Sequence, residues 1–401
     1  MARLLEHHAL EFLAKRGIAV PGFAVATSAE EARRAASGFG RPAVVKALIP
    51  VGGRGKAGAI KFAESPEEAF AHAQSLLGRT VLNFPVERLL VSERLDIATE
   101  LFVSITFDSM TRGPVVLFSA PGGIDVEAIL ADDPDRLIQY PVEIGLGLQP
   151  FQAREIAERA GLTGKTLIAA ADALSALYRV FRELDAATVE VNPLAVTGDG
   201  RIVAPSAVIV VDDQALYRHP ELEGIADPNL TNGWRPLTEL ERRMREIDAI
   251  DAGSAIRFNE FPEGGIGFMF TGGGAGFLAF DTMMRLGGDP ATTFDITPGY
   301  VEEKMYLATK AVLSLPRLKG LLAGGNITNF IPIDIKVRGV MRALKELEID
   351  PEAFPVVFRF AGPGADAARE LADALPGIEY YGAESTIEDV VERIVELTRN
   401  R

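Results

Sequence analysis

A glycine-rich loop with several cations lies early in the chain, within the segment 44–61. The buried run before the loop presents Lys46, and the loop itself carries Arg54 and Lys56. Its four glycines are Gly52, Gly53, Gly55 and Gly58. Backbone amides of such a loop can turn toward phosphate oxygens, and the cations neutralise the charge of a polyphosphate. The segment therefore predicts a phosphate-binding loop, with a solvated hairpin as the alternative interpretation.

Carboxylates and an amide near strand ends form a second group of candidates. Glu190 and Asn192 are two residues apart on a predicted strand, so their side chains point to one face. Together they can offer oxygen ligands to Mg²⁺ or to a polyphosphate, although two polar residues on a solvent-facing strand have the same spacing. Glu93 and Glu100 lie near a strand edge and are candidates for contact with an adenine amine or a ribose. Ordinary surface carboxylates are the alternative.

Three glycine-rich turns follow β-like runs in the second half of the chain. The first lies in the segment 269–283, where successive glycines separate a strand from a helix. The others are AGGNITNF at 323–330 and FRFAGPGAD at 358–366. Free backbone N–H groups at a helix start bind carboxylates or phosphates, and open α/β sheets bind ligands at the carboxyl ends of their strands. One turn alone is compatible with simple turn chemistry, but three on one edge predict a ligand site.

The elements around the first two candidate groups mix helical and extended patterns. Helical spacing runs over 4–16, and Ser28 with Glu31 three residues later caps a second helix. The runs 99–108 and 113–120 have the pattern of an antiparallel pair. Further helices are predicted at 150–160 and 165–183, and strands around 188–196 and 201–211. This order predicts an α+β unit that contains the glycine-rich loop.

Beyond a Pro-, Asn-, Glu- and Arg-rich connection at about 218–245, the pattern becomes regular. Strands and helices alternate there, at a spacing typical of a doubly wound parallel sheet. The β-like runs are 266–271, 291–296, 318–323, 355–360 and 377–381, and the helical ones lie near 275–286, 301–314, 333–347, 364–375 and 386–399. We therefore predict a domain over 1–240, with a small subdomain at about 20–100, and a second domain over 241–401.

Composition excludes several classes of function. The formal net charge of −15 over 401 residues disfavours sequence-independent binding to nucleic acid or to anionic lipid. The chain has no cysteine, so disulfides, thiolate metal sites and cysteine nucleophiles are excluded. The amphipathic N-terminus contains acids, and no apolar run approaches the ~18 residues of a membrane span. A cytoplasmic protein without a nucleic-acid or membrane partner is expected.

Six motifs in this order give the chain a family resemblance that covers nearly its whole length. They are VVKA…VGGRGKAGAIK, TELF, SAPGGIDVE, LQPFQAREIAERAGL, VEVNPLAVT and FTGGGAGFLAFDTM. Together they resemble the β subunits of succinyl-CoA synthetase, the ADP-forming succinate–CoA ligase. The resemblance implies an ATP-grasp domain followed by a flavodoxin-like CoA-ligase domain with a parallel sheet.

The resemblance also implies cofactors and a partner. ATP and Mg²⁺ would be used, and CoA would be bound mainly by an α-type subunit, in an αβ or α₂β₂ assembly. In the family mechanism ATP phosphorylates a histidine of the α subunit, the phosphate passes to the acid, and CoA displaces it to give the thioester. The four histidines here are His7, His8, His72 and His219. None lies in a glycine-rich loop at a helix start, which agrees with a histidine supplied by the partner.

The resemblance assigns roles to the candidates of the first half. Phosphates would be held by Lys46, Gly53, Arg54, Gly55 and Lys56, and the nucleoside by Glu93 and Glu100. Glu190 would have a catalytic role at the docked phosphohistidine loop, and Asn192 would bind Mg²⁺. At the second Mg²⁺ position the family aspartate is replaced by Ser206, and the lysine two residues on by Val208. A hydroxyl is a weaker Mg²⁺ ligand than a carboxylate, and Asp212 and Asp213 lie about 20 Å further along an extended strand.

The second half departs from the succinate enzymes toward another acid. The family Asn-Gly-Ala-Gly appears as Thr271-Gly272-Gly273-Gly274, and Gly-Gly-Gly-Ala becomes Ile296-Thr297-Pro298-Gly299. The segment GGNITNF is similar to the citrate-binding turn of ATP-citrate lyase, whose chemistry includes citryl-CoA formation. The substrate-binding residues expected by this analogy, in addition to the turn 271–274, are Asn326, Thr328, Asn329 and Arg359. Arg359 would form a charge-assisted pair with a carboxylate.

These observations predict the β-type subunit of an ADP-forming acid–CoA ligase that joins a di- or tricarboxylic acid to CoA, as succinate–CoA ligase does. A citrate–CoA ligase or ATP-citrate lyase subunit is one alternative. The replacement of the family aspartate by Ser206 also permits a degenerate nucleotide-binding regulatory subunit. An ATP-grasp enzyme that joins a carboxylate to another nucleophile is the last alternative.

Overall fold

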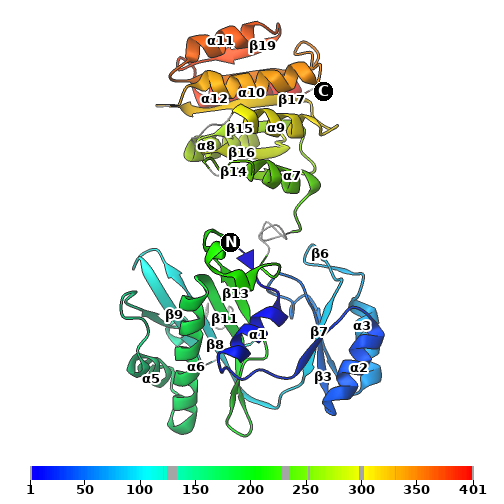
Figure 1. Cartoon of the computed structure of the whole chain (residues 1–401), viewed down its shortest axis with the longest axis vertical. Helices are drawn as coiled ribbons and strands as arrows, with labels where there is room; N and C mark the ends of the chain where they lie inside the picture. The colour runs from blue at the N-terminus through cyan, green and yellow to red at the C-terminus, as the bar shows by residue number, and fades with distance from the viewer. Residues whose placement is uncertain are drawn as a thin grey trace. The chain divides into compact units, whose positions relative to one another are not determined.

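The chain folds into two compact units, Met1–Pro236 and Leu237–Arg401 (Figure 1). This computed structural model describes residues 2–120, 122–123, 133–226, 235–251, 253–297, 302–329 and 331–399. Among these residues, none of the helices is both long and apolar enough to cross a membrane.

The main sheet of the first unit has seven strands, and all of its pairings are antiparallel. Its order is β1 (Ala2–Arg3), β13 (Val208–Val211), β11 (Ala186–Thr197), β8 (Ile97–Asp108), β9 (Gly113–Ser119) and β10 (Ile138–Pro141), with β12 (Ile202–Val203) paired to β11. The predicted antiparallel pair is confirmed as β8 and β9. The helices of this part are α1 (Glu6–Lys15), α5 (Pro150–Arg159) and α6 (Gly164–Glu183), and its short 3₁₀ turns are Pro134–Arg136, Asp213–Arg218 and Pro220–Leu222. Helix α6 buries Leu174, Leu177 and Phe181 in the core that it shares with β8 and β11.

A smaller antiparallel sheet in the same unit carries the glycine-rich loop. Its order is β2 (Phe23–Ala26), β7 (Leu89–Glu93), β3 (Ala43–Ala47) and β4 (Ile60–Ala63). Helices α2 (Ala29–Phe39) and α3 (Pro66–Leu76) pack together beside this sheet, and a short hairpin joins β5 (Thr80–Val81) to β6 (Phe84–Pro85) (Figure 1). The predicted cap of α2 is confirmed, because the Glu31 amide donates to Ser28 Oγ at 3.2 Å. In a capping box the Glu31 carboxylate would accept from the amide of Ser28. Here it accepts from the amide of Thr27 instead, at 2.7 Å.

The second unit is built on a parallel sheet with helices on both faces, which confirms the predicted fold class. Its strands, in sheet order, are β15 (Ile266–Thr271), β17 (Gly320–Ile327), β18 (Val356–Ala361) and β19 (Ile378–Tyr381). Helices α8 (Gly273–Arg285) and α12 (Ile387–Thr398) share a core with one face. Helices α7 (Glu239–Asp248), α9 (Glu302–Leu313), α10 (Ile333–Glu346) and α11 (Ala365–Asp373) share a core with the other. The carboxyl ends of the parallel strands therefore meet at one edge.

One predicted strand does not join this sheet. The run 291–296 was expected to be parallel to its neighbours, but β16 (Thr292–Ile296) pairs antiparallel with β14 (Ile256–Glu260). Just before β16, Pro290 forms an isolated parallel bridge with Ile266 of β15. The Thr292 hydroxyl then bonds to both the amide and the carbonyl of Phe268, each at 3.0 Å. The amide and carbonyl of Phe268 are thus bonded to a side chain, whereas a β-ladder between β15 and β16 would need them for main-chain bonds.

Candidate functional site

Lys46 lies at the centre of the smaller sheet, with its ammonium group buried. All five residues of β3 are buried, and the Lys46 side chain is 7% exposed. Lys46 Nζ donates to Glu6 Oε1 at 3.0 Å and to the carbonyl of Pro205 at 2.7 Å. The predicted phosphate ligand is therefore held between the first helix and the residue before Ser206.

Glu6 joins the two buried cations of the predicted phosphate site. Arg54 Nη1 donates to Glu6 Oε2 at 2.5 Å and to the carbonyl of Ala47 at 3.2 Å. Although burial alone would raise the pKa of Glu6, the charges and hydrogen bonds of Arg54 and Lys46 lower it to about 2. Glu6 is thus an internal counter-anion for Lys46 and Arg54.

Glu6 was not among the predicted site residues, although the sequence contains a signal for it. Glu6 falls on the same helical face as Ala9, Leu10 and Leu13, which are all buried in α1. A carboxylate in that register must be buried with the apolar residues. Because a buried carboxylate needs a partner, its position alone indicates a nearby cation.

Glu190 shares its surroundings with Arg3, another residue that the sequence analysis did not single out. Arg3 pairs with Val210 and Glu190 pairs with Val208, so all four side chains point to one face of the main sheet. Burial and the charge of Arg54 lower the pKa of Arg3, while Glu190 acts in the opposite direction. The charges of Arg54 and Glu190 therefore both act on Arg3. A two-residue strand gives no periodic signal by which Arg3 could have been found.

Asn192 positions a loop next to Glu100. Its Oδ1 accepts from the Gly123 amide at 2.8 Å and its Nδ2 donates to the Gly123 carbonyl at 3.1 Å. Gly123 has φ +92°, and a Cβ at this position would lie 2.0 Å from Glu100 Oε2. Only glycine fits here without displacing Glu100. The structure therefore brings Asn192 and Glu100 together through Gly123.

The remaining candidates of the first unit lie at the end of β7 and in the glycine-rich loop. Glu93 ends β7, where its Oε2 accepts from the Gly22 amide at 3.3 Å. Lys56 is exposed in the glycine-rich loop. That loop closes through bonds from the Ala57 amide to the carbonyl of Gly53 at 3.1 Å, and from the Gly58 amide to that of Gly55 at 3.0 Å.

The predicted Mg²⁺ ligands do not form a donor set that fits this ion. Asn192 and Ser206 are neutral, and the Asn192 amide is bonded to Gly123 at both ends. Protein sites usually bind Mg²⁺ through one or two carboxylates together with substrate phosphates. No group of three or more histidine, aspartate or glutamate side chains able to hold a metal occurs in the described part of the chain. The described side chains alone therefore do not form an Mg²⁺ site.

In the second unit, the glycine turns meet at the carboxyl edge of the parallel sheet. Thr271 Oγ1 donates to the Gly324 carbonyl at 3.2 Å, and the Gly272 amide donates to Asp295 Oδ1 at 2.8 Å. Gly272 has φ +101°, and a Cβ there would lie 2.7 Å from Asn326 Oδ1. Thr271, Gly272 and Asn326 are thus neighbours, and Gly273 and Gly274 begin α8 beside them.

Arg359 is buried at the same edge. The residue is 6% exposed, and its side chain donates to two carbonyls. Nη1 donates to the carbonyl of Gly325 at 2.5 Å, and Nη2 donates to that of Ser385 at 3.2 Å. Its Nε has no hydrogen-bond partner among the described residues. Burial lowers the pKa of Arg359, and the charge of Glu384 opposes this effect. The guanidinium therefore retains an unused donor.

Three further candidates complete this edge of the sheet. The Thr328 amide donates to the carbonyl of Ala361 at 2.9 Å, which ties the second turn to the third. Asn326 and Asn329 are exposed. Pro298 and Gly299, which the family comparison singled out, lie outside the described residues. Lys336, which was not among the predicted site residues, is a buried lysine of α10 whose Nζ lies 3.4 Å from Thr271 Oγ1.

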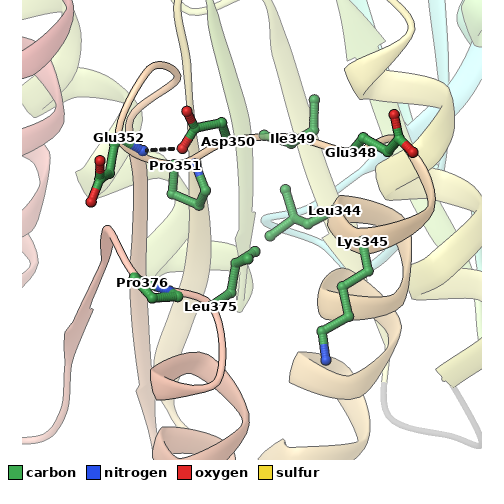
Figure 2. Close-up of a pocket in the computed structure, with 9 residues that line it drawn as sticks. All are labelled: Leu344, Lys345, Glu348, Ile349, Asp350, Pro351, Glu352, Leu375 and Pro376. Atoms are coloured by element: carbon green, nitrogen blue, oxygen red, sulfur yellow. Dashed lines mark hydrogen bonds between the residues drawn. The ribbon is translucent and has the colours of Figure 1, made fainter.

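A surface depression of about 470 Å³ lies at the other edge of the sheet, where β18 and β19 begin. Figure 2 shows its apolar side chains with charged ones around them. Its residues are Leu344, Lys345, Glu348, Ile349, Asp350, Pro351, Glu352, Leu375 and Pro376. Three acids against one lysine disfavour an anionic ligand. The candidate acid site is therefore the carboxyl edge and not this depression.

Two family models match the chain. The model described as ATP-grasp domain matches residues 3–196. The model described as ATP citrate lyase citrate-binding matches residues 235–397. The predicted ATP-grasp fold of the first half is confirmed by the first match.

A solved structure shares the fold over the full chain. It is that of ATP citrate lyase from Methanothrix soehngenii in complex with citrate and coenzyme A. The similarity has a TM-score of 0.78 at 22% sequence identity and covers 100% of both chains. At this level of identity the likeness extends to the fold alone.

Relatives of higher identity are β subunits. The chain is 38% identical over 380 residues to the GDP-forming succinate–CoA ligase subunit beta of Thermus thermophilus, which covers 94% of this chain and 95% of that protein. It is 38% identical over 372 residues to the ADP-forming succinate–CoA ligase subunit beta of Chloroflexus aurantiacus, with 92% and 93% covered. The ADP-forming protein of Rubrobacter xylanophilus is 36% identical over 400 residues, with 99% of each chain covered. By this similarity along nearly its whole length, and as its motifs predict, the chain belongs to the family of succinate–CoA ligase β subunits.

Proposed function

We propose that this chain is the β-type subunit of an ADP-forming acid–CoA ligase. The reaction converts ATP, a di- or tricarboxylic acid and CoA to acyl-CoA, ADP and phosphate, and succinate is the first candidate acid. The observation that carries the proposal is the similarity, over 99% of the chain, to a protein named ADP-forming succinate–CoA ligase subunit beta. The ATP-grasp match supports the use of ATP.

The buried cations of the first unit support binding of the nucleotide phosphates. Lys46 and Arg54 are held by Glu6 in fixed positions, so little reorganisation is needed when phosphate oxygens approach them. Attraction between opposite charges is stronger in such a buried setting than in water. The loop around Gly53, Gly55 and Lys56 would cover the phosphates, and Glu93 and Glu100 would contact the nucleoside.

The positions of the histidines support a partner that supplies the phosphorylated side chain. His219 is bonded to Asp185 at 2.8 Å and to Glu221 at 3.2 Å, and His72 Nε2 lies 3.0 Å from the carbonyl of Phe62. His7 and His8 stack on α1 with ring centroids 3.7 Å apart. Burial and the charge of His8 lower the pKa of His7 to about 4. An α-type subunit would carry the phosphohistidine and most of the CoA site, with Glu190 beside its docked loop, in an αβ or α₂β₂ assembly.

The acid would bind at the carboxyl edge of the second unit. Its proposed ligands are Thr271, Gly272, Gly273, Gly274, Asn326, Thr328, Asn329 and Arg359. Citrate is a second candidate acid, because the citrate-binding family model matches residues 235–397. A regulatory subunit without turnover is a third candidate, motivated by the neutral donors Asn192 and Ser206.

Replacing Ser206 by aspartate tests the metal assignment. A carboxylate is a much stronger Mg²⁺ ligand than a hydroxyl, so Ser206→Asp should lower the Kd for ATP in the presence of Mg²⁺ by roughly tenfold. Calorimetric titration with and without Mg²⁺ measures this change. Ser206→Asn introduces a side chain with the shape of aspartate but without its charge, and it should leave the Kd for ATP within about twofold of the unmodified value. An equal effect of both variants would argue against a metal ligand at this position.

Phosphate transfer to the partner tests the function itself. The full chain is co-purified with its α-type subunit and incubated with ATP labelled in the γ-phosphate. We expect an acid-labile label on the partner, which is typical of phosphohistidine, and only when both subunits are present. Label on neither subunit, in a complex that binds ATP, would favour the regulatory candidate.

A further inference from the structure

Two buried cations at the carboxyl edge of the second unit lack a carboxylate partner among the described residues. Lys336 is 7% exposed, and its only hydrogen bond there is the 3.4 Å contact with Thr271 Oγ1. Arg359 is 6% exposed and donates to two carbonyls, with Nε unused. A buried charge is costly when no opposite charge compensates for it. Both side chains are therefore poised to receive an anion.

The other buried lysines of the chain show that this arrangement is unusual for it. Lys46 is paired with Glu6 at 3.0 Å. Lys304 is paired with Asp248 at 3.2 Å and also donates to two carbonyls at 2.5 Å. Lys336 has Asp295 within electrostatic range, but Asp295 Oδ1 binds the Gly272 amide and makes no ion pair with Lys336. Burial lowers the pKa of Lys336, as expected for an ammonium group without a close counter-ion.

The two cations approach the strand ends from opposite faces of the sheet. Phe358 and Phe360 point into the core beneath α10, so Arg359 between them points to the other face. Lys336 comes from α10 itself. Arg359 donates directly to the Gly325 carbonyl of the inner strand β17. Lys336 contacts Thr271 Oγ1 of β15, which in turn donates to the Gly324 carbonyl of β17.

Two glycines of β17 lie at the ends of the strands, where the neighbouring strands pack closely against them. A Cβ at Gly324 would lie 2.5 Å from the carbonyl oxygen of Arg359, and a Cβ at Gly325 would lie 2.5 Å from Thr271 Oγ1. Any side chain at either position would collide with its neighbours. Both positions therefore require glycine, and β17 presents only main chain next to Thr271 and Arg359.

The chemistry of an acid–CoA ligase separates the carboxylates of its substrate into two kinds. The reacting carboxylate must stay accessible to the phosphoryl group and then to CoA. A carboxylate buried against a cation is instead a fixed anchor. A dicarboxylic acid has one carboxylate to spare as an anchor, whereas a tricarboxylic acid has two. Two unpaired buried cations fit the second case.

We infer that Lys336 is a specificity-determining residue that binds a second non-reacting carboxylate, so that the site prefers a tricarboxylic acid to a dicarboxylic one. The inference rests on the proposed function for the nature of the reaction, but it concerns binding and is measurable without turnover. Arg359 binds the first non-reacting carboxylate of either kind of acid.

The test compares binding of propane-1,2,3-tricarboxylate and succinate to the full chain by calorimetric titration. The unmodified chain should bind the tricarboxylate at least about tenfold more tightly, because one additional charge-assisted contact is formed. Lys336→Met should remove this difference and leave the Kd for succinate within about twofold. Lys336→Arg, which keeps the charge, should restore part of the preference. Arg359→Gln should weaken both acids.

A control and two opposing results complete the design. Lys345→Met changes an exposed lysine of the same helix and should change neither Kd. The inference would be overturned if Lys336→Met weakened the binding of both acids equally, or if the unmodified chain bound the tricarboxylate no more tightly than succinate. Turnover is measured separately with the α-type partner. Tight tricarboxylate binding without thioester formation would refute the proposed function alone, whereas turnover without any difference between the acids would refute only the role of Lys336.

Discussion

Replacing Glu6 by glutamine should lower the free energy of unfolding of the chain by about 3 kcal/mol, because it leaves two buried cations without their counter-anion. Lys46 and Arg54 both donate to the Glu6 carboxylate, which is 4% exposed. A pKa lowered from 4.5 to about 2 corresponds to roughly 3 kcal/mol, which agrees with this expectation. Chemical denaturation followed by circular dichroism measures the change.

The same prediction has a pH dependence with a definite sign. The folded-state pKa of Glu6, about 2, lies below its ordinary value of 4.5. The carboxylate therefore stabilises the folded chain fully above about pH 4.5, and this contribution is lost as the pH falls toward 2. The difference in stability between the unmodified chain and Glu6→Gln should stay constant above pH 4.5 and narrow below it.

Glu11→Gln is the matched control, because Glu11 lies on the same helix and is exposed. Its effect on the free energy of unfolding should stay within about 0.5 kcal/mol. If Glu6→Gln were as mild as this control, the ion pairs around Glu6 would contribute little to stability. If the difference in the free energy of unfolding between the two variants grew as the pH was lowered, the sign of the pKa shift would be contradicted.

Lys46→Met should abolish most of the protection that ATP gives the chain against heat. With ATP at about a hundred times its Kd, binding stabilises a protein by about 2.7 kcal/mol. Loss of a buried, charge-assisted contact to the phosphates should weaken binding by roughly a hundredfold and leave less than about 0.5 kcal/mol of this protection. Differential scanning calorimetry with and without ATP measures the shift in Tm.

The comparison is made within each variant, so a change in basal stability caused by the lost ion pair with Glu6 cancels. Lys165→Met removes an exposed lysine at the start of α6 and should leave the ATP shift unchanged. If Lys46→Met retained the full shift in Tm, the nucleotide would bind elsewhere in the chain.

Local patterns were sufficient to predict much of the fold. The antiparallel pair β8 and β9, the Ser28 cap of α2 and the alternating elements of the second unit all depend on residues close together in the sequence. The family motifs then predicted the ATP-grasp fold and the β-subunit family. The edge of the sheet that carries the glycine turns was also predictable, because strands of a parallel sheet end on one side.

Contacts between distant residues could not be read in the same way. Lys46 is 40 residues from Glu6 and 159 from Pro205, and Asn192 is 69 residues from Gly123. No local period records such pairs. The antiparallel pairing of β16 with β14 also joins residues that are far apart in the sequence, and the Thr292 hydroxyl bonds to the main chain of Phe268 in place of a ladder.

Lys336 left a weak signal that is easily misinterpreted. It lies on the buried side of α10 among Ile333, Val337 and Val340. A single lysine on an apolar helical face is usually read as a snorkelling side chain at its margin. Only the burial of the lysine and the absence of a close acid among the described residues distinguish it from that case.

The central claim, that this chain is the β-type subunit of an acid–CoA ligase, is tested most directly by thioester formation. The chain is co-purified with its α-type partner and supplied with CoA, ATP, Mg²⁺ and, in turn, succinate, malate, citrate and related acids. We predict an acyl-CoA thioester and an equal amount of ADP with at least one of these acids. No thioester with any of them, in a complex whose partner accepts phosphate from a known β subunit, would contradict the claim.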